Sequence, residues 1–314
     1  MVYVTPDFYP EFQCIASRCR HSCCIGWEID IDKESLRRYQ EMAGPLGDKL
    51  RAHISPEKPS HFILGEKERC PFLNDQQLCE LILAEGEECL CEICAEHPRF
   101  YNEYSGRCEA GLGLCCEEAA RLLLDWDCGV TLMEFSDGEE DGDEENQPNL
   151  EQREQLFALA QDRSVPIRLR IENVLRYVNY MSLDHLLQKN WPEVYSSLER
   201  LDESWTDILR ELSEMERCAE SLDDESLACG YENLLVYFLY RHFMNMENKA
   251  AAAAFAVLST AVIAAADSAY LTKHGELSLE QRVEHVRLYS SEIEYSDENV
   301  DALLEWLEEQ RKEN

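Results

Sequence analysis

Apolar residues recur at helical spacing through the second half of the chain. One stripe consists of residues three or four positions apart, Ile171, Val174, Leu175 and Val178. A longer stripe runs from Val194 to Leu212. The segment Tyr231–Tyr240 is apolar on nearly every side and precedes the alanine-rich run 250–266, as is typical of helices at the centre of a bundle. These patterns predict an α-helical second half.

The first half shows only short-range patterns. Four apolar residues alternate with polar ones and indicate a short strand: Ile25, Trp27, Ile29 and Ile31. Asp32 follows and can cap a helix over Lys33–Met42 that stops near Gly44–Pro45. The rest of this half reads as loops and short helices, as expected where metal ligands rather than a large apolar core organise the chain.

An acidic run at residues 137–145 separates the two halves. Like charges repel, so we predict a linker there. We therefore divide the chain into a cysteine-rich metal-binding domain at 1–132, an acidic linker at 133–150 and a helical domain at 151–314. The predicted fold class is mainly α, with an irregular cysteine-rich N-terminal domain containing short strands and a C-terminal helical bundle.

Charge narrows the choice of partners. Among 314 residues, 29 Lys and Arg stand against 64 Asp and Glu, a net charge of −35. Nucleic-acid binding needs clustered cations, so we expect no nucleic-acid partner. An acidic protein can instead attract a lysine-rich surface, although many acidic proteins are simply soluble.

The apolar runs and the first residues of the chain indicate its cellular compartment. The alanine-rich run reaches only the lower length limit of a membrane span, and we expect a buried helix and no membrane contact. The opening MVYVTPDFYPEF shows no secretory signal, so we expect a cytoplasmic protein. In a reducing compartment, many cysteines indicate metal or redox chemistry rather than disulfides.

The chain holds 15 cysteines, and 13 of them lie between Cys14 and Cys128. Cys19-x3-Cys23-Cys24 and Cys91-x2-Cys94 are spaced closely enough for each group to reach one metal. Thiolates bind soft centres, so Zn²⁺ and an iron–sulfur cluster both remain open, as does a metal that only holds a loop-rich domain together.

Seven short blocks contain most of these cysteines: Phe12-Gln-Cys14, Cys19-Arg-His-Ser-Cys23-Cys24-Ile-Gly-Trp27, Cys70-Pro-Phe-Leu73, Leu78-Cys79, Leu90-Cys91-Glu-Ile-Cys94, Pro98-Arg99 and Leu114-Cys115. In sequence and order, these blocks resemble those of the flagellin lysine-N-methylase family. The chain is also similar to the wider group of proteins with a cysteine-rich zinc- or iron-chelating domain. The resemblance is strong over about residues 8–125 and looser around Tyr231–Phe238 and Arg241–Phe243.

Some positions depart from the family pattern. Where the family has Ser-Cys-Pro-Glu, this chain reads Leu114-Cys115-Cys116-Glu117. Cys116 is therefore an added thiol, and Cys89, Cys108 and Cys128 also look like additions.

The resemblance implies methyl transfer from S-adenosylmethionine to lysines of flagellin or a similar protein, together with a cysteine-ligated iron–sulfur cluster. It implies, as metal ligands, Cys14, Cys19, Cys23, Cys24, Cys70, Cys79, Cys91, Cys94 and Cys115. A [4Fe–4S] cluster takes four thiolates, and we rank Cys19, Cys23, Cys70 and Cys94 first. Zinc is the alternative metal.

Arg99 is the candidate for binding the methyl donor, through the carboxylate of its methionine end. No catalytic residue is assigned. The groups placed by the matching blocks to accept a proton from lysine are Glu28, Asp30, Asp32, Tyr101 and Glu109. His21 and His97 are weaker metal-ligand candidates beside so many thiols.

We therefore predict a cytoplasmic protein-lysine N-methyltransferase whose partner is a lysine-bearing protein. The alternative is a non-catalytic zinc- or iron-chelating module whose helical domain docks a partner. The sequence predicts no oligomeric state.

Overall fold

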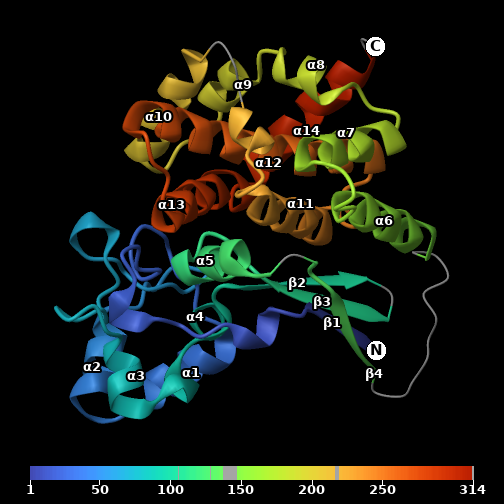
Figure 1. Ribbon diagram of the computed structural model, residues 1–314. Helices are drawn as coiled ribbons and strands as arrows, with labels where there is room; N and C mark the ends of the chain where they lie inside the picture. Colours follow the sequence, from blue (N-terminus) through green and yellow to red (C-terminus); the bar gives the residue numbers. More distant parts are fainter. Residues whose placement is uncertain (105, 128, 137–146, 216–218, 313–314) are drawn as a thin grey trace. The chain divides into compact units, whose positions relative to one another are not determined.

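The computed structural model describes residues 1–104, 106–127, 129–136, 147–215 and 219–312. The chain forms two compact units. The helical unit comprises residues 1–12, 101–115 and 119–314, and the cysteine-rich unit comprises residues 13–100 and 116–118. Figure 1 colours both units along the sequence.

Helices make up most of the helical unit. They are α6 (Gln147–Ala160), α7 (Ile167–Tyr177), α8 (Leu183–Leu187), α9 (Trp191–Ser197), α10 (Glu203–Ser213), α11 (Ala228–His242), α12 (Lys249–His274), α13 (Leu279–Tyr289) and α14 (Asp297–Lys312). A 3-10 helix lies at Glu220–Asp223 and a π-helix at Ser290–Glu294. Mainly α was the predicted fold class, and the structure confirms it.

Helix α12 forms the centre of this unit. Every residue from Ala250 to Ser268 is buried, and α12 contacts α7, α10, α11, α13 and α14 (Figure 1). Among the described helices, α12 alone is long and apolar enough to cross a membrane, and its most apolar stretch is completely buried. Burial on all sides by other helices matches the core helix predicted from the alanine-rich run.

A four-stranded sheet belongs mostly to the helical unit. Its strands are β1 (Val2–Pro6), β2 (Arg99–Tyr104), β3 (Arg107–Leu112) and β4 (Leu132–Ser136). The strand order is β2-β3-β1-β4, with β1 parallel to β3 and antiparallel to β4. Val4 of β1 is fully buried, so this sheet contributes to the core of the unit.

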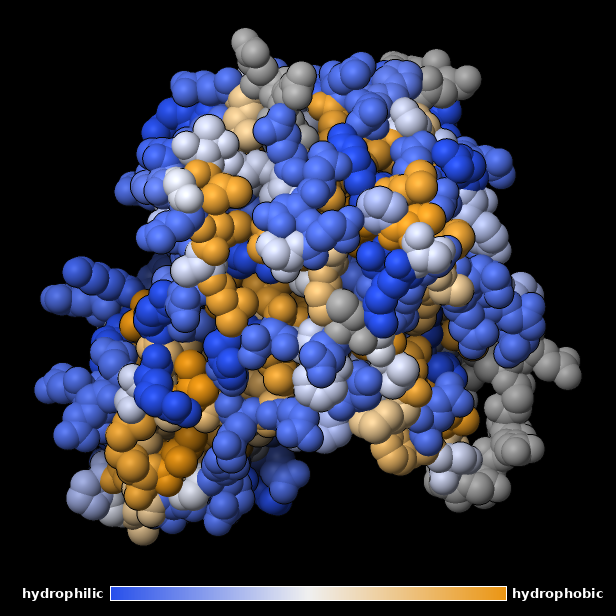
Figure 2. Space-filling view, in the orientation of Figure 1, coloured by the Kyte–Doolittle hydropathy of each residue, from blue (hydrophilic) through white to orange (hydrophobic). Residues whose placement is uncertain are grey.

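The cysteine-rich unit consists of short helices and long connections. Its α-helices are α1 (Lys33–Glu41), α2 (Gly44–Ala52), α3 (Glu80–Glu85) and α4 (Glu92–Glu96). Its 3-10 helices are Ala16–Arg18, Glu66–Glu68 and Glu87–Cys89. Helix α5 (Glu117–Asp125) starts in this unit and continues in the other. In Figure 2, apolar side chains gather at the lower left, where α2 and α3 lie. Leu83 of α3 is 60% exposed.

Helix ends that depend on residues close in sequence were predicted best. Asp32 caps α1 by accepting hydrogen bonds from the amides of Glu34 and Ser35, as expected. Helix α1 ends at Glu41, shortly before Gly44–Pro45, and this pair opens α2, which we did not predict. Proline at the first turn costs no hydrogen bond, which explains the new helix.

Two predicted elements differ from the structure. The stripe 194–212 is divided between α9 and α10 because the Asp202 side chain caps a new helix by accepting from the amide of Ser204. The predicted strand at Ile25–Ile31 appears as two isolated bridges, Ile25 with Arg69 and Asp30 with His61.

The compact units also differ from the predicted domain boundaries. Residues 1–12 and 101–115 lie in the helical unit rather than in a cysteine-rich domain at 1–132. Strand β4 and the start of α6 occupy the ends of the predicted linker at 133–150. Residues 137–146 of that linker lie outside the described residues. Strand pairing over long sequence distances causes the difference, because β1 joins β3 and β4.

Candidate metal centre

Backbone pairing within the cysteine-rich unit joins Cys24 to Cys70. The Cys70 amide donates to the Cys24 carbonyl at 2.8 Å, and the Gly26 amide donates to the Glu68 carbonyl at 3.1 Å. Two cysteines from distant parts of the sequence therefore occupy neighbouring chain segments.

A tight turn places Cys79 near Cys70. The Asn74 side-chain oxygen accepts from the amides of Gln76 and Leu78 at 2.9 and 3.0 Å, a local pattern that fixes a turn. The chain then returns, so that Leu73 forms a bridge with Cys79. The thiols of Cys70 and Cys79 are close enough to interact electrostatically.

Helix α4 supplies the next pair of thiols. Cys91 precedes its first turn, and Cys94 lies one turn later, so the two side chains meet and share a hydrogen bond. The second carboxylate oxygen of Asp32 accepts from the Glu92 amide at 3.0 Å and ties this turn to the start of α1. Partial burial opposes ionisation of Asp32, but backbone hydrogen bonds from Ser35 and Glu92 outweigh it and lower its pKa to about 2. Asp32, a predicted proton acceptor, is thus a capping residue.

Electrostatic interactions divide the cysteines into two groups. The first thiol group is Cys24, Cys70, Cys79, Cys91 and Cys94. The second thiol group is Cys14, Cys19, Cys23 and Cys116. The Cys23–Cys24 hydrogen bond connects them. The four cysteines ranked first from the sequence fall evenly between these groups.

The ionisation of these thiols follows two patterns. Burial raises the pKa of Cys70 and of Cys19 to about 12. In the two hydrogen-bonded pairs, the Cys23 thiol lowers the pKa of Cys24 to about 7, and the Cys94 thiol lowers that of Cys91. The pKa of each donor, Cys23 and Cys94, is raised in return because its proton is shared. Each pair therefore favours one thiolate, the form that binds metal.

The adjacent residues Cys115 and Cys116 have different surroundings. Cys115 lies in the helical unit, where it hydrogen-bonds Tyr295 and burial raises its pKa to about 11. Cys116 lies in the cysteine-rich unit and interacts with Cys19 and Cys23. The role of Cys115 as a ligand stays a prediction. Cys116, an addition relative to the family pattern, thus lies beside the other thiols, and its replacement of a family proline is the sequence signal that marks it.

Aromatic residues pack beside the thiols. The Trp27 indole donates to the Cys23 carbonyl at 2.5 Å, and its ring lies 5.8 Å from that of His97. Burial lowers the pKa of His97 to about 4, so this imidazole is neutral. The Tyr39 hydroxyl donates to the Cys89 carbonyl at 2.7 Å.

The remaining predicted site residues lie in three kinds of setting. Arg99 is half-buried at the start of β2, and Tyr101 is 48% exposed on the same strand. Glu109 is fully buried and binds Arg153 through two contacts of 2.6 Å, so it is a structural ion-pair partner and not an accessible base. Glu28 and Asp30 lie close to His61.

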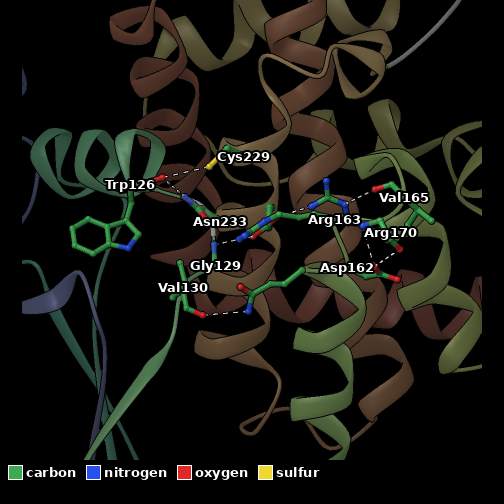
Figure 3. Close-up of polar contacts among 12 residues, drawn as sticks. Trp126, Gly129, Val130, Asp162, Arg163, Val165, Arg170, Cys229 and Asn233 are labelled. Atoms are coloured by element: carbon green, nitrogen blue, oxygen red, sulfur yellow. Dashed lines mark hydrogen bonds and ion pairs between the residues drawn. The ribbon is translucent and has the colours of Figure 1, made fainter.

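The helical unit buries a second kind of polar site, shown in Figure 3. Glu232 accepts from Arg170 at 2.5 Å, from Arg163 at 2.6 Å and from the Gly129 amide at 2.9 Å. Figure 3 labels these three donors. The Asn233 side-chain amide donates to the Trp126 carbonyl at 3.0 Å. These contacts satisfy the buried carboxylate and join α11 to α7 and to the connection between α6 and α7.

The helical unit also contains a surface pocket of about 380 Å³. It is lined by Glu199, Leu201, Glu294, Tyr295, Ser296, Asp297, Glu298 and Asn299. Glu294 closes the π-helix and pairs with His242 at 2.7 Å. Besides this paired carboxylate, three acidic residues line the pocket, Glu199, Asp297 and Glu298, so it favours cations.

Residues 139–314, more than half of the chain, match the model of the FliB lysine N-methylase C-terminal domain. The chain belongs to this lysine N-methylase family. The match lies in the half whose resemblance looked looser from motifs alone.

Relatives bear similar names. A lysine-N-methylase of Salmonella typhimurium is 30% identical over 136 residues, which are 41% of this chain and 34% of that protein. The flagellar biosynthetic protein FliU of Salmonella muenchen is 28% identical over 126 residues, 38% of this chain and 75% of FliU. The aligned region thus spans about a third of the length of the first of these relatives. No solved structure matches the chain.

Proposed function

We propose that the protein is a cytoplasmic protein-lysine N-methyltransferase that uses S-adenosylmethionine and acts on flagellin or a similar lysine-bearing protein. Membership of the lysine N-methylase family, through residues 139–314, is the observation that carries this proposal. The net charge of −35 and the acidic pocket beside Tyr295 support a substrate with a basic surface.

The proposed reaction is a direct methyl transfer. The neutral lysine ε-amine attacks the sulfonium methyl, a C–N bond forms, the C–S bond breaks, and S-adenosylhomocysteine leaves. The amine must first lose its proton, because an ammonium has no lone pair. A pocket that desolvates lysine or places a carboxylate nearby lowers that cost.

We also propose that the cysteine-rich unit holds an iron–sulfur cluster, with zinc as the alternative. The donor set fits either metal centre, since free thiols from separate segments gather and two of them favour the thiolate form. Four residues of the first thiol group, Cys24, Cys70, Cys91 and Cys94, would hold the cluster, with Cys79 as the next candidate. When bound, a cluster would supply the positive charge that buried thiolates lack, and it can carry an electron.

Two measurements test these proposals separately. Anaerobic purification followed by iron, sulfide and zinc analysis tests the metal centre, and we expect iron and sulfide in similar amounts with a broad visible absorption band. Stoichiometric zinc without that band would contradict the cluster. Cys94→Ser should lose most of the metal, whereas Cys108→Ser, a buried cysteine of β3, should keep it.

Methyl transfer is tested with labelled S-adenosylmethionine and flagellin. We expect label on flagellin lysines with the metal-loaded protein. A loaded protein that binds no methyl donor and labels no lysine would instead favour a non-catalytic chelating module.

A further inference from the structure

Strand-like alternation places two carboxylates on one side of the segment 28–31. Ile29 and Ile31 are buried, 1% and 6% exposed, so Glu28 and Asp30 point to the opposite side. The Phe62 amide donates to the Ile29 carbonyl at 3.1 Å, which fixes the neighbouring segment in register. The bridge between Asp30 and His61 sets the imidazole beside both carboxylates.

The three side chains converge on one point. One ligand atom each from Glu28, Asp30 and His61 lie within 4.8 Å of one another. The His61 Nε2 atom is 3.4 Å from a Glu28 carboxylate oxygen. A charge-assisted hydrogen bond is shorter, about 2.7–2.9 Å. Two ligands of one tetrahedral metal with bonds of about 2.1 Å lie about 3.4 Å apart, which matches this spacing.

A carbonyl outside this group orients the imidazole. His61 Nδ1 lies 3.1 Å from the Pro59 carbonyl oxygen. A carbonyl only accepts, so Nδ1 carries the proton and the lone pair is left on Nε2, the atom that faces Glu28. Metal-binding histidines commonly have this outer hydrogen bond, because it fixes both the tautomer and the ring.

We propose that Glu28, Asp30 and His61 bind a divalent metal ion of the Mn²⁺ or Zn²⁺ class. Two carboxylates supply two negative charges, and an imidazole supplies a nitrogen, a donor set unlike the soft thiol groups. Three protein ligands leave further positions for water. The proposal depends neither on methyl transfer nor on the thiol-bound centre.

Mn²⁺ is the chosen probe because it prefers oxygen and nitrogen over thiolates. The full chain is titrated with Mn²⁺ at about 0.15 M ionic strength, where weak binding to surface charge is screened, and free Mn²⁺ is followed by electron paramagnetic resonance. We expect a single Mn²⁺ site above the weak background, with coupling to an imidazole nitrogen in pulsed spectra. The Mn²⁺ affinity should fall about tenfold or more in each of three variants, Glu28→Gln, Asp30→Asn and His61→Asn. Loss of an outer-shell partner already lowers metal affinity by about this factor, and loss of a ligand should lower it at least as much.

Two controls accompany these variants. His53→Asn removes a half-buried imidazole whose Nδ1 lies 2.9 Å from the Lys49 carbonyl, and Glu34→Gln removes an exposed carboxylate of α1; both should bind Mn²⁺ like the wild type. The Glu28 side chain is 61% exposed, so Glu28→Gln tests the site even if His61→Asn does not fold. Wild-type protein without a site above background, or equal binding by Glu28→Gln and Glu34→Gln, would overturn the proposal. Persistence of the nitrogen coupling in a folded His61→Asn variant would also overturn it.

Discussion

The two compact units bury polar groups in opposite ways. In the helical unit, four buried carboxylates have an arginine partner within the chain: Glu109 has Arg153, Glu232 has Arg170, Asp267 has Arg282, and Glu294 has Arg241. In the cysteine-rich unit, the main neighbours of several buried or half-buried thiols are other thiols.

This contrast separates stability from binding. When a buried carboxylate forms an ion pair with an arginine, the arginine balances its charge, and the carboxylate is not available to a ligand. Thiols that meet thiols keep raised pKa values or share protons, and a metal cation from outside would stabilise their negative forms further. The helical unit therefore folds with its own charges paired, whereas we expect the cysteine-rich unit to depend on metal.

Metal removal should have the largest effect. Structural thiolate sites supply binding free energies of about 10 kcal/mol or more, which become folding free energy. Chelation should therefore expose residues 13–100 to hydrogen exchange and proteolysis while α11 and α12 keep their protection. The measurement is hydrogen exchange read by mass spectrometry on metal-loaded and chelated protein. Equal protection of residues 13–100 in both samples would remove the contrast between the units.

Breaking an internal ion pair should rank second. Glu232 is 1% exposed, and Glu232→Ala leaves Arg170 buried without its carboxylate. We expect a loss of about 4 kcal/mol in the free energy of unfolding, because stranding a buried charge costs about 3–5 kcal/mol. Denaturant unfolding measures this, with the exposed Glu193→Ala as the control that should change little. A loss below about 1 kcal/mol, the value of an exposed pair, would show that this network does not support the helical unit.

Protonation of Glu109 at low pH should lower the free energy of unfolding of the helical unit. Burial opposes ionisation of Glu109, but hydrogen bonds and charge from Arg153 outweigh it and hold its pKa below the usual value near 4.5. A depressed folded-state pKa contributes stability above the unfolded value, and this stability is lost as pH falls from about 4.5 through the folded pKa. Glu109→Gln should cost about 3 kcal/mol at neutral pH and flatten the loss of stability below pH 4.5. Unfolding free energies at several pH values test it, and an unchanged acid slope would contradict the assignment.

The sequence predicted features that depend on neighbours along the chain. Asp32 caps α1 through amides two and three residues away, and the alanine-rich run is long enough to identify α12 as a core helix. Family resemblance was equally visible in the cysteine spacing. These signals need no knowledge of distant contacts.

Long-range pairing could not be predicted in the same way. Nothing in Val2–Pro6 indicates that it joins β3 and β4, and this pairing is what moves both chain segments into the helical unit. Which of the adjacent residues Cys115 and Cys116 lies beside the other thiols depends on the compact unit to which each belongs. His61 meets Asp30 only through a bridge between distant segments, so it carried no signal in the sequence.

The smallest expected effect comes from a neutral hydrogen bond in the cysteine-rich unit. Tyr39 is fully buried, and its hydroxyl donates to the Cys89 carbonyl, which also accepts from Arg38 at 3.2 Å. Tyr39→Phe should therefore cost only about 1 kcal/mol, since the carbonyl keeps a donor. Thermal unfolding of metal-loaded protein measures this, beside Tyr177→Phe at a 44% exposed position as the control. A loss of several kcal/mol would mean that ordinary hydrogen bonds, rather than bound metal, hold this unit together, and it would weaken the contrast between the two units.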